Sequence, residues 1–167
     1  MAVEPREYWE LAEGEAYRIT DWLHRYEVKD SKSPVQQGDV DPKLCSQPLK
    51  YIRWGYDQAG DCIFGLKLGI GYRRLLSVAQ KLKIPAMLGL GLFGKLLEIA
   101  GSKRRGLRGW IADDRFERMD AAAIAFGMGI PENEAIDGLK LLAHPDVKWI
   151  ERSEADLNQI KSQVIHK

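Results

Sequence analysis

The sequence predicts an α+β fold that is mostly helical: a winged helix-turn-helix core with an N-terminal helix and a β-hairpin. Apolar residues recur at spacings of three and four over much of the chain, as in amphipathic helices. A short glycine turn divides two helical stretches within residues 119–142, and an aromatic, β-branched stretch precedes a turn at Gly60. With 167 residues, the chain has room for one ordinary domain, or for a small domain with an appendage.

Residues 5–27 are predicted to form a helix. Its apolar stripe consists of Trp9, Ala12, Ala16, Ile19 and Leu23. In one interpretation the helix packs on its own domain. In the other it is an acidic aromatic arm that docks on a protein partner, and its contacts would be Trp9, Tyr17 and Trp22.

Residues 28–48 are rich in turn formers and lack apolar periodicity, which marks a linker. The predicted organisation is therefore an N-terminal helix and linker over 1–48, a winged-helix-like core over 49–151, and a C-terminal helical tail over 152–167. The β-hairpin is expected at residues 49–68, where aromatic and β-branched residues flank the turn.

The central part of the chain predicts four helices and two short strands. Glycine and proline punctuate the helices, and prolines 85 and 131 stand at positions that suit the start of a helix. The helices are expected at residues 72–83, 85–100, 119–126 and 131–142, the strands at 110–111 and 147–150, and a polar terminal helix at 151–167.

Helix–turn–helix spacing followed by an aromatic strand is the pattern of a winged helix. The elements that carry it are the helix end at 92–100, the glycine and basic loop with Trp110-Ile111, the run Ile124–Ile130, the helix Ala135–Leu142 and the strand Val147–Ile150. On these residues, segment 72–151 resembles the winged-helix domain of DnaD-like replisome organisers and related phage replication proteins. The resemblance implies nucleic-acid binding, or assembly of a replication complex.

The helix that would read DNA departs from that pattern. It begins Pro131-Glu132-Asn133-Glu134, and Lys140 is its only basic residue. A helix that enters a DNA groove usually carries several lysines or arginines. This favours phosphate contact by other elements, or a winged helix that contacts protein.

Charge is unevenly placed along the chain, although the formal net charge is only +1. Residues 1–61 carry 8 bases and 12 acids, residues 62–110 carry 10 bases and 1 acid, and residues 111–167 carry 7 bases and 11 acids. A basic middle of net +9 between flanks of −4 predicts an anionic partner for one surface. Nucleic acid, DNA in preference to RNA, is the favoured partner, and an acidic protein surface is the competing one.

The predicted nucleic-acid contacts are basic side chains, with one aromatic ring for base stacking. Glycines at 101, 106 and 109 would let the loop between them approach a phosphate backbone closely. The predicted residues are Arg73, Arg74, Lys81, Lys83, Lys103, Arg104, Arg105, Arg108 and Trp110.

Catalytic patterns are weak, so we expect a protein that is not an enzyme and has no cofactor and no metal. The three histidines are scattered, and no serine or cysteine has a nucleophile's setting. The carboxylates between Asp113 and Asp120 could hold a divalent cation, but a solvated polar turn is favoured. Gly89-x-Gly91-x-x-Gly94 formally matches a dinucleotide fingerprint but lacks a preceding strand, so it predicts close helix packing.

Two cysteines, Cys45 and Cys62, are too few for a disulfide scaffold. The N-terminus has no apolar signal core, and no stretch has the length and apolarity of a membrane span. The sequence therefore predicts a cytoplasmic protein whose partners are nucleic acid and other protein subunits, with no membrane.

Overall fold

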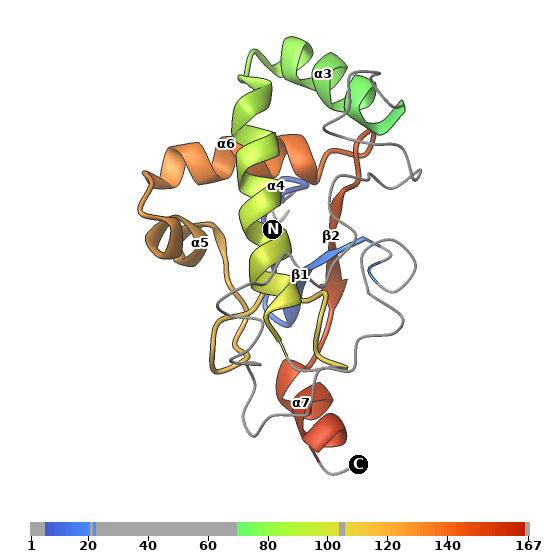
Figure 1. Cartoon of the computed structure of the whole chain (residues 1–167), viewed down its shortest axis with the longest axis vertical. Helices are drawn as coiled ribbons and strands as arrows, with labels where there is room; N and C mark the ends of the chain where they lie inside the picture. The colour runs from blue at the N-terminus through green and yellow to red at the C-terminus, as the bar shows by residue number, and fades with distance from the viewer. Residues whose placement is uncertain (1–5, 21, 23–69, 104–105, 166–167) are drawn as a thin grey trace, which may run out of the picture.

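A computed structural model describes residues 6–20, 22, 70–103 and 106–165 (Figure 1). This part of the chain has an α+β fold, as predicted. Its elements in chain order are β1 (Glu15–Ile19), α3 (Ile70–Leu82), α4 (Ala86–Gly101), α5 (Ala121–Met128), α6 (Glu132–Leu142), β2 (Ile150–Glu154) and α7 (Leu157–Ile165). The predicted linker and β-hairpin over 28–68, both cysteines, Arg104 and Arg105 lie outside the described residues.

The four central helices are confirmed to within a few residues, and local chemistry explains their ends. Asp120 caps α5 because its side chain accepts a hydrogen bond from the Ala123 backbone N–H. Gly129 ends the same helix in the left-handed conformation, with φ 68°. Prolines 85 and 131 stand at the N-caps of α4 and α6.

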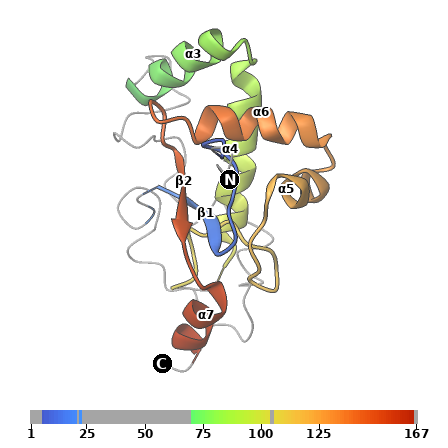
Figure 2. The same ribbon diagram turned by 180° about the vertical axis from the view of Figure 1, so that it is seen from behind.

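Helices α4 and α6 cross at close range, and α3 lies over one end of the pair (Figures 1 and 2). The crossing depends on glycine: a Cβ at Gly138 would lie 2.5 Å from Cδ2 of Leu92, and one at Gly89 would lie 3.1 Å from Cδ1 of Leu141. Gly89 thus serves helix packing, as predicted, whereas Gly91 of the same glycine pattern faces open space. The core continues to Trp149, whose ring centre is 4.9 Å from that of Phe93.

Strand β1 lies between two segments that are far from it in sequence. It pairs antiparallel with β2, in a register that runs from Glu15 opposite Glu154 to Ile19 opposite Ile150. Its other edge meets Trp110 through an isolated bridge at Arg18, with the Ile111 backbone N–H donating to the Tyr17 carbonyl. Residues 110–111 therefore do not form the predicted strand, and Trp110 instead forms an isolated bridge to β1.

The predicted N-terminal helix is wrong for residues 6–20, which form a turn and then β1. Gly14 has φ +81°, which a continuing right-handed helix does not allow. In the strand, Tyr17 and Ile19 point into the main core, and Ala16, on the opposite face, is buried in a second apolar cluster. A distant partner strand decides between the two structures.

The last strand and the last helix both begin later than predicted. Residues 145–148 continue the turn after α6, because Val147 and Lys148 both donate backbone hydrogen bonds to the His144 carbonyl. The predicted strand at 147–150 therefore begins only at Ile150, and α7 begins at Leu157 after β2 has ended. Leu157 packs in a small second apolar cluster with Ala16, Leu107, Ala112 and Phe116.

Among the described helices, none combines the length and the apolar character required to cross a bilayer.

Candidate nucleic-acid interface

Helix α3 separates its apolar and basic side chains. Leu75, Val78 and Ala79 are buried against the core, whereas Arg73, Arg74 and Lys81 are exposed. Positions 73, 77 and 81 follow one another at intervals of four residues, so they line one side of the helix. Lys83 is exposed directly after the helix end. We call Arg73, Arg74, Lys81 and Lys83 the α3 basic face.

The chain segment that forms this surface is poor in acids, although the exposed Asp146 lines a hollow together with Arg74 and Val78. Within residues 70–103 the single acid is Glu98, and Lys95 pairs with it at 3.1 Å. In the described part of the chain, Arg74, Lys81 and Lys83 form no ion pair with a carboxylate. The positive charge of these three residues is therefore available to an external anion.

The basic loop at 103–108 differs from the prediction. Lys103 is 3% exposed and Arg108 is 8% exposed, so both predicted phosphate contacts are buried. The Arg108 Nε donates to the Lys103 carbonyl at 2.9 Å, and Gly109 donates to the Ala100 carbonyl, which folds the loop back onto the end of α4. The prediction was wrong for these two residues because it took a run of basic residues between glycines for an exposed loop that a phosphate backbone could approach.

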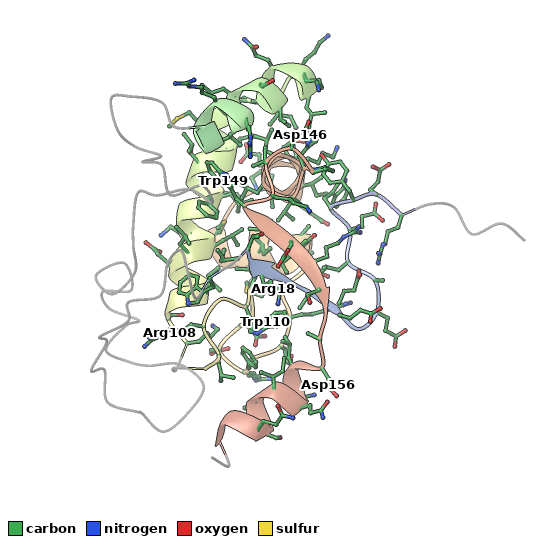
Figure 3. All side chains as sticks on the ribbon, turned by 90° about the vertical axis from the view of Figure 1, so that its right-hand side faces the viewer. Arg18, Arg108, Trp110, Asp146, Trp149 and Asp156 are labelled. Carbon is green, nitrogen blue, oxygen red and sulfur yellow. The ribbon has the colours of Figure 1, made fainter. Side chains whose placement is uncertain are left out.

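Trp110 is half-buried, and its ring already has a cationic neighbour. The Arg18 guanidinium carbon lies 5.7 Å from the ring centre, and Figure 3 shows the two residues together on the sheet. Arg18 also pairs with Glu151 on β2, at 2.6 Å. This pair holds Arg18 over the Trp110 ring, so a base could stack on that face of the indole only by displacing the arginine.

The aromatic residues predicted as a docking arm belong to the chain's own core. Tyr17 is 1% exposed and Trp22 is 5% exposed, and Trp9 is half-buried with the Lys140 ammonium 5.8 Å from its ring centre. The Tyr17 hydroxyl donates to the Trp9 carbonyl, and burial raises the pKa of Tyr17. Burial therefore removes Tyr17 and Trp22 from the predicted docking arm, and this segment packs on the chain's own core as a strand in place of a helix.

Two arginines tie the N-terminal coil to the rest of the fold, and sequence reasoning missed both. Arg152 of β2 donates to the Glu7 and Glu10 carbonyls at 3.0 and 2.7 Å. Arg118 donates to the Ala12 and Glu15 carbonyls at 2.5 and 3.0 Å. Neither residue lies in the basic segment, and nothing in their neighbouring sequence indicated this role.

The carboxylates at 113–120 have local structural partners. Asp113 Oδ1 accepts backbone hydrogen bonds from Arg115 and Glu117, which closes a tight turn, and Asp120 caps α5. In the residues described, no group of three or more histidine, cysteine or acidic side chains is arranged to hold a metal ion. These bonds support the polar-turn interpretation of the segment.

An open hollow of about 900 Å³ lies at the opposite end of the molecule from α3, beside the start of α7. Its lining combines the guanidinium of Arg118 with five carboxylates, those of Glu13, Glu15, Glu117, Glu154 and Asp156. Glu15 lines it. Its pKa lies below the usual value because the Ala12 backbone N–H and then Arg6 hydrogen-bond the charged form. The two ends of the molecule therefore differ in charge.

The chain matches no protein-family model, no curated protein and no solved structure.

Proposed function

We propose that the protein is a non-enzymatic nucleic-acid-binding module of the winged-helix type that contacts the phosphate backbone through the α3 basic face. In this role it serves as a subunit of a larger nucleoprotein assembly. The observation that carries the proposal is the set of exposed cations on α3, in a segment that contains a single acid.

The order of elements supports the winged-helix part of the proposal. Helices α4, α5 and α6 are followed by β2, and a short turn at Gly129 joins α5 to α6. The strand that pairs with β2 is the N-terminal β1, whereas a wing is a hairpin formed by consecutive strands. In this proposal, β1 takes the place of the second wing strand.

The charges of α6 argue for backbone contact in place of groove reading. Its first turn exposes Glu132 and Asn133, and Glu134 and Asp137 are half-exposed. These side chains would repel phosphates at the entrance of a groove. Binding through α3 does not require α6 to enter a groove, so affinity depends on charge and little on base sequence.

Titration of a labelled duplex at several salt concentrations tests the proposal. Each phosphate contact that is lost lowers the slope of log affinity against log salt by about 0.9 on duplex DNA. We therefore expect Arg74→Gln with Lys81→Gln to weaken binding and to lower the slope by about 1.8. A single-stranded probe of the same length, measured in parallel, shows whether the surface prefers duplex or single strand.

Arg115→Gln is the matched control. Arg115 is an exposed arginine in the turn beside α7, at the other end of the molecule from α3 (Figure 1). Its replacement removes a charge from outside the α3 basic face, so the slope should stay unchanged. Equal losses for Arg115→Gln and for the α3 variant would contradict the proposal, as would a wild-type protein that binds neither probe.

A further inference from the structure

Phe126 is an apolar side chain for which the fold provides no cover. Its exposed fraction is 91%, and among the described residues the other large exposed apolar side chain is Met87, at 74%. Phe126 lies on the outer side of α5 together with the exposed Ala122, one turn earlier. The other exposed residues of 122–129 are the small Ala122, Gly127 and Gly129, so the phenyl ring protrudes alone, as an anchor that inserts into a partner does.

The stretch of sequence on both sides of Phe126 is acidic. Between Met119 and Leu139 the chain carries four acids and no lysine or arginine. The turn after α5 is closed by the Ile130 backbone N–H donating to the Ala125 carbonyl, and α6 then opens with Glu132 and Glu134. A carboxylate near a helix N-terminus stabilises the helix, which accounts for these two acids. The helix dipole gives no reason for the exposed phenyl ring.

We infer that Phe126 and the acids of the first turn of α6 form a docking surface for a cationic amphipathic helix of a partner protein. The apolar stripe of such a helix would cover Phe126, and its lysines or arginines would face Glu132 and Glu134. This surface is separate from the α3 basic face and carries the opposite charge.

Charge and burial decide against other occupants. Nucleic acid and anionic lipid headgroups would both be repelled by the acids of α6. The α3 basic face of a second copy has the required positive charge, but Leu75, Val78 and Ala79 of that helix are already buried in their own core. The buried apolar side chains of α3 in a second copy are therefore not available to cover the phenyl ring.

Synthetic helical peptides test the inference on the full chain after nuclease treatment. The probe carries leucine at positions i, i+3, i+4 and i+7 and lysine elsewhere. A scrambled peptide of equal composition and a peptide with glutamate in place of lysine are the comparisons. Fluorescence anisotropy should show binding of the lysine–leucine helix alone. Binding of all three peptides with equal affinity, or of none, overturns the inference.

Variants then locate the contact. Phe126→Ala should weaken binding of the lysine–leucine helix about tenfold or more, as expected for an anchor residue. Glu132→Gln with Glu134→Gln should weaken it less and reduce its salt dependence. Met87→Ala removes the other exposed apolar side chain and is the matched control, with affinity unchanged. An equal loss in Met87→Ala, or no loss in Phe126→Ala, overturns the assignment.

Two further measurements separate the docking surface from the α3 basic face and from self-association. Because Phe126 is exposed, its alanine variant should keep the wild-type melting temperature and the wild-type affinity for duplex DNA. Arg74→Gln with Lys81→Gln should keep the peptide affinity, so the docking surface and the nucleic-acid proposal can each fail alone. Sedimentation that shows self-association abolished by Phe126→Ala would identify a second copy as the occupant and overturn the partner-helix inference.

Discussion

Helices α4 and α6 and strand β1 line the same core, yet their backbone hydrogen bonds go to different partners. Each helix satisfies its own backbone and needs its neighbours only to cover an apolar side. Strand β1 bonds to β2 on one edge and to residues 109–111 on the other, and both partners are distant from it in sequence. The coil before it is held by Arg118 and Arg152. A segment of this kind has no stable structure without the rest of the fold.

The largest expected effect tests whether β1 belongs to the same cooperative unit as the helices. Tyr17 and Trp149 are both less than 2% exposed, so alanine at either site should cost about 3–5 kcal/mol in unfolding free energy. Urea denaturation followed by helical circular dichroism should show one transition, shifted to a similar extent in both variants. If Tyr17→Ala left the helical transition in place while Trp149→Ala shifted it, β1 would be an appendage to an independent helical core.

Gly109→Ala gives the next largest effect, at the point where the N-terminal segment meets the end of α4. Gly109 has φ +101°, and a Cβ there would lie 2.9 Å from Cβ of Trp22. Backbone strain and the clash together should destabilise the protein by about 2–3 kcal/mol, measured by urea denaturation.

Gly14→Ala is the comparison for that variant. Gly14 also has a positive φ, +81°, but no atom lies within 4 Å of its Cβ position. Its cost should be about 1 kcal/mol, from backbone strain alone. Equal losses of unfolding free energy in the two variants would show that Trp22 does not pack against Gly109.

Glu15→Gln gives an effect as small as that of Gly14→Ala, but one that depends on pH. The pKa of Glu15 is lowered on folding, so its contribution to stability is present above its unfolded pKa and is lost as pH falls through its folded pKa. The variant should be about 1 kcal/mol less stable at neutral pH. Urea denaturation at a series of pH values should show this difference shrinking on the acid side. A difference that is constant with pH would mean that the charge of Glu15 does not contribute.

The candidate site was predicted only in part. Exposure that depends on local contacts was predicted correctly, and burial that depends on distant contacts was not. The exposure of Arg73, Arg74 and Lys81 follows from the helical period, because the apolar residues between them fix which side is buried. Lys103 and Arg108 are buried because their loop folds back onto the end of α4. The spacing of residues in the sequence does not predict that path of the loop. The exposure of Phe126 was not predicted from the sequence either, since an aromatic residue in an alanine-rich helix is more often buried.

The sequence by itself determined the α+β class, the four central helices with their caps, and the separation of charge along the chain. These features depend on residues within a few positions of one another, so propensity, period and capping suffice. The tertiary structure decided that residues 15–19 are a strand, because that requires β2 and Trp110 as partners. It also decided which cations remain exposed, because exposure depends on what else packs nearby.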